Sequence, residues 1–203
     1  MKRLLVISLM LPALVFSARA QGESPVHVGA DWGFMATMLN FHHYNYMDEG
    51  IGYRIDDRGW SSDMGANAYA FLCASLDLGN RFNLGVIGGY AGVNDGVRVI
   101  PVELRLNYFP RSSHEDGMLV FLQGGAGFKT GEGDGIIFLG QGGAGYRLAL
   151  SRRHSLDFKL CLQVSYDHPK VWDPLEQNYI SERNIRRDNA SYYGLGLGLG
   201  LEF

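Results

Sequence analysis

Long, strict alternation between apolar and polar or small residues limits the fold of this sequence more than any other feature. The clearest example is SLDFKLCLQVSYD, residues 155–167, which puts six apolar residues on one face and Asp, Lys, Cys, Gln, Ser and Asp on the other. A period of two indicates a β-strand. Strands of ordinary globular sheets have about 5–6 residues, whereas a tilted strand that crosses a bilayer needs about 9–11. The length of this segment therefore favours a membrane-spanning strand.

Similar runs recur along the chain and predict eight strands, with weak helical periodicity between them. We expect an all-β fold, an eight-stranded antiparallel up-and-down transmembrane β-barrel. The expected strands cover residues 26–42, 65–78, 82–93, 97–109, 118–129, 136–150, 155–167 and 191–203.

The connections between these strands alternate between the two ends of the expected barrel. Short polar turns fall at one end, and the two longest connections, residues 43–64 and 168–190, fall at the other. Outer-membrane barrels keep short turns in the periplasm and longer loops outside, so both termini are expected to be periplasmic. Aromatic belts are expected at both interfaces. The periplasmic belt would contain Phe82, Tyr108, Phe109 and Phe203, and the outer aromatics would be Tyr44, Tyr46, Tyr53, Trp60, Trp172, Tyr179, Tyr192 and Tyr193.

The last ten residues, GLGLGLGLEF, fit this arrangement. In lipid every backbone N–H and C=O must be bonded within the protein, so the last strand must pair with the first. We expect its leucines to face acyl chains and its glycines to face a crowded lumen. The same alternation predicts that Leu104, Leu156, Leu160 and Leu199 face lipid.

The N-terminal segment MKRLLVISLMLPALVFSARA has a basic start, an apolar run and an Ala-Arg-Ala cleavage pattern. Residues 1–20 are therefore interpreted as a secretory signal peptide, which leaves residues 21–203 as the barrel domain. Removal of Lys2, Arg3 and Arg19 would take the formal net charge from −3 to about −6.

The strand pattern and the C-terminus resemble the small eight-stranded outer-membrane β-barrels of the OmpA/OmpX-like type. Gly198, Leu201 and Phe203 resemble the C-terminal signal by which such barrels are recognised for insertion, and VIPVELRLNYFP and QGGAGF resemble segments of porin-like barrels of Bacteroidetes type. The resemblance implies the outer membrane of a Gram-negative bacterium as location. It implies three kinds of partner, namely outer-membrane lipid with lipopolysaccharide, the barrel assembly machinery, and a surface ligand of the long loops.

Charged residues on the polar face of the strands are predicted to lie in the lumen. Eight strands enclose just enough space for side chains, and buried charges must pair. We therefore expect a lumen plugged by ion pairs. The candidate residues are Asp31, Asp77, Glu103, Arg105, Arg147, Asp157 and Lys159.

Catalytic chemistry has little support in the sequence. Ser165, Asp167 and His168 near the outer rim are the candidates for a lipid-modifying site. GQGGAG, residues 140–145, lies within a strand, where it does not serve as a dinucleotide loop. His42 and His43 should project to opposite faces, so no metal site is expected, and no cofactor is expected. Cys73 and Cys161 are predicted to be free thiols, because their strands lie three steps apart in the wall.

The sequence therefore predicts a structural or surface-interaction protein of the outer membrane that displays residues 43–64 and 168–190. The mixed charge gives no basic patch for nucleic acid. Three alternatives remain: a rim enzyme that modifies lipid A, a narrow porin-like channel, and a soluble lipocalin-like barrel, whose apolar residues would face inward.

Overall fold

The computed structural model describes residues 25–48, 50, 52–62, 64–94, 96–130, 135–151, 154–173 and 177–203. The predicted signal peptide lies outside these residues. Within them, no helix is long and apolar enough to cross a membrane.

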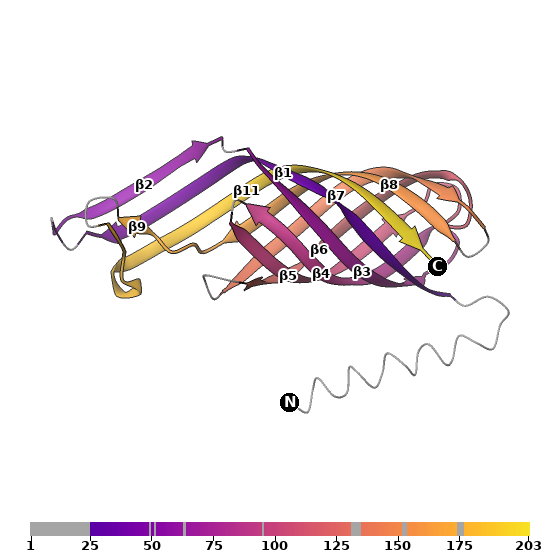
Figure 1. Ribbon diagram of the computed structural model, residues 1–203, viewed down its shortest axis with the longest axis horizontal. Coiled ribbons are helices and arrows are strands. Elements are labelled where there is room, and N and C mark those ends of the chain that lie inside the picture. The colour runs from indigo at the N-terminus through magenta and orange to yellow at the C-terminus, as the bar shows by residue number, and fades with distance from the viewer. Residues whose placement is uncertain are drawn as a thin grey trace, which may run out of the picture.

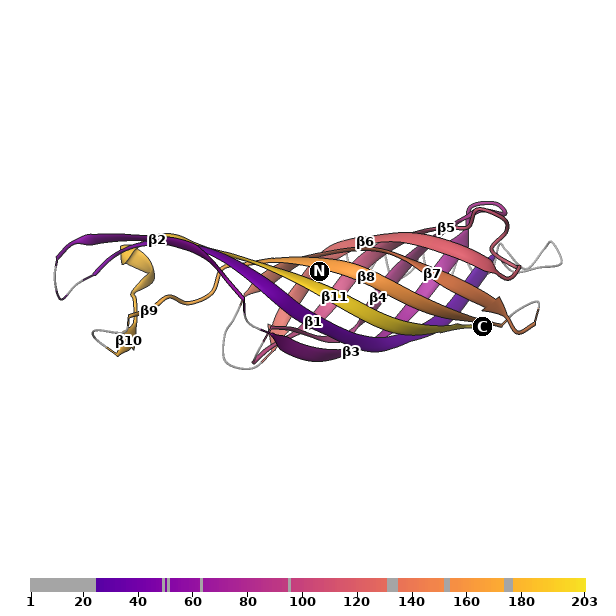
Figure 2. The same cartoon turned by 90° about the horizontal axis from the view of Figure 1, so that it is seen from above.

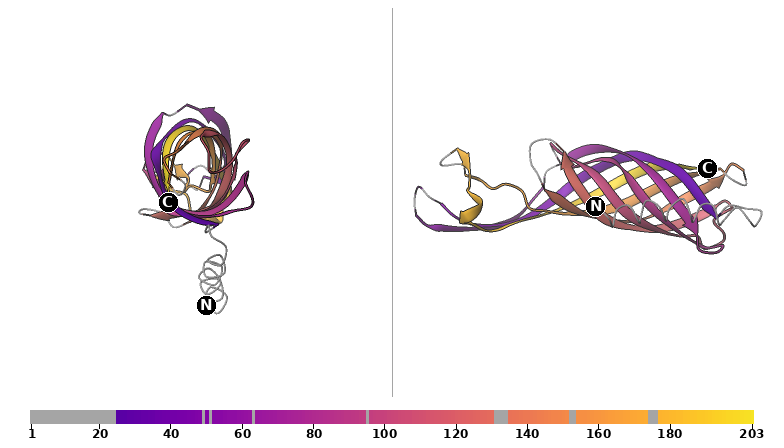
Figure 3. Two further views of the ribbon diagram at one scale, coloured as in Figure 1. Left: turned by 90° about the vertical axis from the view of Figure 1, so that its right-hand side faces the viewer. Right: turned by 90° about the horizontal axis from the view of Figure 1, so that it is seen from below.

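Eight antiparallel strands in the described part of the chain close into a barrel, with each strand paired to its sequence neighbours and β11 paired to β1 (Figure 1; Figure 3, left). The predicted fold class is confirmed. The barrel strands are β1 (Val26–Met47), β3 (Gly65–Asp77), β4 (Phe82–Asn94), β5 (Val97–Tyr108), β6 (Gly117–Thr130), β7 (Ile136–Ala149), β8 (Ser155–Asp167) and β11 (Ile185–Glu202).

Alternation along the strands separates a polar and packed interior from an apolar exterior. In β5, Leu104 is 58% exposed, whereas its neighbours Glu103 and Arg105 are buried. In β8, Leu160 is exposed between the buried Cys161 and Lys159. Leu156 and Leu199 lie half-buried on the same outward face. A lipocalin-like barrel with its apolar face inward is therefore excluded.

Two kinds of packing fill the lumen. Apolar side chains fill one part of it. Charged and amide groups fill most of the centre and of the end near the C-terminus, together with a second, smaller apolar cluster that includes Met35 and Phe121. The first apolar cluster contains Phe71, Ile87, Ala91, Val93, Val99, Ile137, Leu139, Ala190 and Tyr192.

The structure corrects the description of residues 43–64 and 168–190 as loops. β1 continues to Met47, turns back as β2 (Arg54–Ser61), and β11 already starts at Ile185. Residues 40–47 of β1, β2 and residues 185–189 of β11 form a three-stranded extension, here called the arm, which projects beyond the barrel at the end away from the C-terminus (Figures 1 and 2). A register shift between Thr37 and Leu39 marks the place where β1 exchanges β3 for β2 as its partner. Such bulges bend a strand and let it leave a sheet.

The rest of residues 168–190 crosses beside the arm. It contains the short pair β9 (Trp172–Asp173) and β10 (Asn178–Tyr179) and the 3-10 helix η2 (Glu182–Asn184) (Figure 2). Val171 and Asp173 are buried there, as are Tyr46 and Asp48 at the end of β1. This connection is therefore folded rather than fully solvated.

Three aromatics assigned to the interfaces lie inside instead. Phe109 is 1% exposed, and Tyr46 and Tyr192 are buried. Phe109 follows Tyr108, so it has the opposite orientation and enters the lumen. Phe82, Tyr108 and Phe203 are exposed, as a belt requires.

Candidate functional site

The centre of the lumen holds a chain of charged and amide groups from four strands. Asp31 of β1 accepts hydrogen bonds from Arg105 of β5 and from Lys159 of β8, the latter with an Nζ–Oδ1 distance of 2.9 Å. Arg105 Nε donates to Gln123 Oε1 of β6 at 2.8 Å, and Gln123 Nε2 donates to Glu103 Oε2 at 2.7 Å. All five side chains are buried. One carboxylate thus links two bases across the barrel, which ties strands that are not neighbours.

Arg147 of β7 anchors a second group nearer the C-terminal end of the barrel. Its Nε and Nη2 atoms donate to the two carboxylate oxygens of Asp157 at 2.8 and 2.9 Å. Nη2 also donates to Glu202 Oε2 at 2.6 Å, and Nη1 donates to the Ser113 carbonyl at 2.9 Å. The guanidinium lies 4.4 Å from the centre of the Phe109 ring, within cation–π range. Fork-like pairing of this kind fixes geometry as well as charge.

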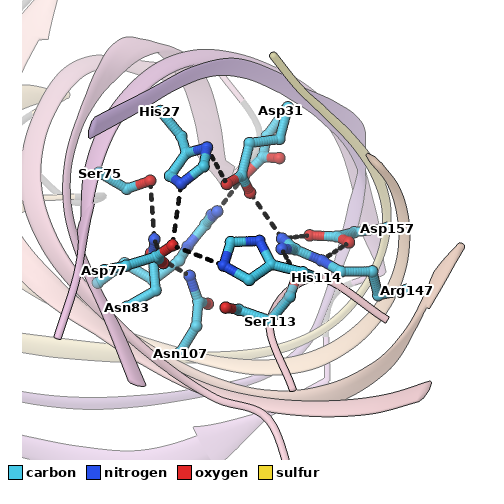
Figure 4. Close-up of polar contacts among 12 residues, drawn as sticks. His27, Asp31, Ser75, Asp77, Asn83, Asn107, Ser113, His114, Arg147 and Asp157 are labelled. Atoms are coloured by element: carbon cyan, nitrogen blue, oxygen red, sulfur yellow. Dashed lines mark hydrogen bonds and ion pairs between the residues drawn. The ribbon is translucent and has the colours of Figure 1, made fainter. Parts of the chain in front are cut away.

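Asp77 of β3 forms the third group, shown in Figure 4. His27 Nε2 lies 2.9 Å from Asp77 Oδ2, and Asn83 Nδ2 donates to Asp77 Oδ1 at 3.0 Å. His114 Nε2 lies 3.5 Å from the same carboxylate, and His27 Nδ1 lies 3.6 Å from Glu202.

Two contacts join the three groups into one network that runs from mid-barrel to its C-terminal end. Lys159 Nζ lies 2.9 Å from Asp31 and 3.8 Å from Asp157. Glu202 contacts both Arg147 and His27. A cavity bordered by Asp31 and Arg105 has a volume of about 20 Å³, which is room for about one water molecule.

The seven lumen residues predicted from the sequence all belong to this network, but not all pair as expected. Asp31, Arg105 and Lys159 come together, as do Arg147 and Asp157. Glu103 contacts the amide of Gln123, and its Oε1 atom has no hydrogen-bond partner among the described residues. Asp77 pairs with His27 rather than with one of the predicted bases.

Sequence reasoning missed several partners. Glu202 shares the inward orientation of the tail glycines, and His27 shares that of Asp31. Both could therefore have been predicted from the alternation of inward and outward positions along their strands. His114 of the turn after β5, which was not among the candidates, also lies close to Asp77. Lys129, whose Nζ atom lies 2.7 Å from Asp167, was also missed.

The rim candidates Ser165, Asp167 and His168 do not form a relay among the described residues. The Ser165 hydroxyl accepts a hydrogen bond from Gln163 at 3.0 Å and is fully buried. Asp167 pairs with Lys129, whereas the His168 ring lies 2.7 Å from Asp188. A nucleophilic serine needs a base within hydrogen-bond reach, and this geometry provides none.

The structure also locates the two cysteines, the C-terminal signal residues and the glycine-rich segment. Cys73 and Cys161 are free thiols. Gly198 lies against the Tyr69 hydroxyl, and the exposed Phe203 is held by backbone hydrogen bonds to Val28. GQGGAG lies within β7, where no helix follows it.

The apolar outer wall of the barrel and the arm meet at a group of aromatic rings. Trp60 of β2 lies 5.0 Å from Phe41 of β1 and 5.5 Å from Tyr193 of β11, measured between ring centres. Beyond these rings, the outward face of the arm carries Arg54, Arg58 and Arg187.

No protein-family model matches the sequence, and no curated protein matches it. The structure is similar to the outer membrane protein OprG from Pseudomonas aeruginosa, with a TM-score of 0.52 and 10% identity over 88% of this chain and 96% of OprG. It also aligns with Neisserial surface protein A (NspA), with a TM-score of 0.44 and 11% identity over 90% of this chain and 100% of NspA. The likeness to OprG, together with the closed strand order, shows that the chain has the fold of a small outer-membrane β-barrel.

Proposed function

We propose that this chain is an integral outer-membrane barrel with a plugged lumen that presents the arm at the cell surface. Both termini would be periplasmic, and outer-membrane lipid would surround the wall. The observation that carries the proposal is the combination of a continuous apolar exterior with an interior that is filled by charged, amide and apolar side chains. Large apolar side chains such as Phe34, Leu72 and Leu122 are 68–72% exposed. Exposure on this scale is typical of a surface that meets lipid or a partner rather than water.

The filled lumen favours a barrel that holds the arm in place over a barrel that transports solutes. Ion pairs and amides cross the lumen at its centre, and the first apolar cluster fills another part of it. Purified protein in planar bilayers is therefore expected to conduct little. A steady, large, ion-selective conductance would reject the plug and favour the channel alternative.

Surface labelling in a Gram-negative host tests location and orientation together. Asp57→Cys places a thiol on the arm, and Ser112→Cys places one in the turn after β5; the native protein, with its inward cysteines, gives the background. A membrane-impermeant maleimide should label Asp57→Cys in intact cells and Ser112→Cys only after the outer membrane is opened. The reverse pattern would overturn the orientation, and recovery of the protein in the soluble fraction would overturn the location.

Removal of the hairpin tests whether the arm is a displayed element or part of the fold. Asn40 and Ser61 are paired across β1 and β2, so a tight turn can replace residues 41–60. The shortened protein should insert and keep the heat-dependent gel mobility of a folded barrel. Loss of that mobility would mean that the barrel needs the arm, which would contradict a display role.

A further inference from the structure

The outward face of the arm continues the lipid-facing wall of the barrel. Tyr193 of β11 pairs with Val164, which is 45% exposed on that wall. The Trp60 ring contacts Tyr193 and Phe41. Trp60 and Phe41 therefore point outward, and so does every second residue beyond them on β1 and β2. Figure 1 shows these two strands running side by side away from the barrel.

Charge is divided between the two faces of the arm. The outward positions of β2 and β11 include Arg54, Arg58 and Arg187, whereas the alternate, inward positions include Asp57 and Asp188. One acid, Asp56, lies on the outward face, and its Oδ1 atom accepts a hydrogen bond from His43 Nε2 at 2.8 Å. Arg58 and Arg187 are exposed and form no ion pair with any described residue.

In the proposed orientation Arg58 lies at the height of lipid headgroups, and Arg187 lies one row further out. Aromatic belts mark the edge of the hydrocarbon core, and the headgroup layer beyond it is about 5–8 Å thick on each side. Arg58 is two residues beyond Trp60, and alternate residues in a strand are about 7 Å apart. Arg187 precedes Asn189 by two residues in β11, and Asn189 pairs with His43 in the row of Arg58. Arg187 is therefore about 7 Å further from the aromatic rings than Arg58 is, and its long side chain can reach back toward the headgroups.

We propose that the outward face of the arm binds the phosphate groups of outer-leaflet lipid headgroups, with Arg58 and Arg187 as the principal ligands. The planar guanidinium donates paired hydrogen bonds to phosphate oxygens, and basic clusters at a membrane surface attract anionic headgroups. Lipid is favoured as the source of the phosphate because the face is continuous with the acyl-chain surface through Trp60 and Tyr193. Arg54 adds charge while its Nη1 atom donates to Asn45 at 2.9 Å. This inference rests on the proposed function, since it requires the arm to leave the membrane beside the outer leaflet.

A titration in maltoside micelles tests the site without cells. The barrel is titrated separately with phosphatidic acid, phosphatidylcholine and inorganic phosphate, and the indole N–H resonance of Trp60 reports binding beside the arginines. Phosphatidic acid should move this resonance, and the other two should move it much less. The double variant Arg58→Gln/Arg187→Gln should bind phosphatidic acid roughly tenfold more weakly or worse, because each arginine near a membrane surface contributes about 1 kcal/mol.

The matched control is Arg81→Gln/Arg111→Gln, which removes the same charge from exposed positions at the opposite end of the barrel. It should bind as the unmodified protein does, and both variants should keep heat-dependent gel mobility. Equal weakening in both variants, an unaffected arm variant, or equal binding of inorganic phosphate would each overturn the proposal. Because no cell is involved, such a result would leave the surface labelling, and with it the proposed function, standing.

Discussion

Strands β1 and β11 pass through two regions in which alternation distributes charge differently. Inside the barrel they put apolar residues outward, as with Phe34 and Leu197, and charge inward, as with Asp31. In the arm the outward face of the sheet becomes charged, and the inward Tyr46 is buried at the end of β1. The change occurs within a few residues of the bulge at Thr37 and Leu39.

With the proposed membrane location, the surrounding solvent rather than strand geometry explains which face is polar. In that location lipid around the barrel would leave only the lumen for charged groups, where they must pair. Beyond the aromatic rings water and headgroups would replace acyl chains, so arginines could face outward. Charges in the lumen are consequently buried and interlocked, and those in the arm are exposed and individually weak.

The largest effect is expected from removing Arg147. Arg147→Ala would leave Asp157 and Glu202 without their shared partner inside the barrel. An uncompensated buried charge costs about 3–5 kcal/mol of the free energy of unfolding. Arg58→Ala, on the arm, should change it by less than about 0.5 kcal/mol. Urea unfolding in lipid vesicles measures both, and similar values for the two variants would contradict the distinction between lumen and arm.

A cation on the lipid-facing wall should have the next largest effect. Leu160 is half-exposed near the middle of β8, and Leu160→Arg should destabilise the barrel by about 2–4 kcal/mol. Asn189→Arg adds the same side chain to the outward face of the arm, where a shift within about 0.5 kcal/mol is expected. If the two substitutions had equal effects in vesicle unfolding, the boundary between acyl chains and headgroups would not lie at the aromatic rings.

Gly142 and Gly143 of β7 face opposite sides of the barrel wall, so they compare the exterior with the lumen. A Cβ atom at Gly143 would collide with the Leu160 carbonyl and would lie 2.9 Å from the Phe121 ring. At Gly142 a Cβ atom would be 3.7 Å from Leu122, an ordinary contact. Gly143→Ala should therefore cost about 1–3 kcal/mol, and Gly142→Ala should be neutral or slightly stabilising. Equal unfolding free energies for the two variants would show that the lumen can relax around an added methyl group.

The sequence was sufficient to predict the eight barrel strands, because each is long and has a period of two. The alternation of residues along each strand also indicated which charged side chains face inward, including Arg105 and Lys159. It did not identify their partners, since the stagger between strands decides which charges meet across a barrel. Asp77 therefore pairs with His27, a pairing that no single strand reveals.

The arm was missed for a different reason. RIDDRGWS, the sequence of β2, has no apolar face and reads as a polar loop. It is a strand because it pairs with β1 from Asn40 to Met47, and its charges protect an exposed edge. Pairing by backbone hydrogen bonds leaves little trace in side-chain pattern, so this element could not be predicted from periodicity.

The smallest effect concerns the ion pair between Asp56 and His43. The hydrogen bond from His43 lowers the pKa of the Asp56 carboxyl below its ordinary value of 3.8. A lowered pKa in the folded state means that the contact stabilises the arm above pH 3.8 and that this contribution is lost as the pH falls through the folded-state value. In an acid titration followed by NMR of the carboxyl carbon, the pKa of Asp56 should lie below 3.8 and should rise toward that value in His43→Ala, because His43 is the largest of the groups that lower it. His42→Ala removes the histidine on the opposite face of the arm and should leave the pKa of Asp56 unchanged. Because Asp56 is fully exposed, the barrel should unfold at the same urea concentration in all three proteins; a change in that midpoint with His43→Ala would mean that the arm and the barrel unfold as one unit.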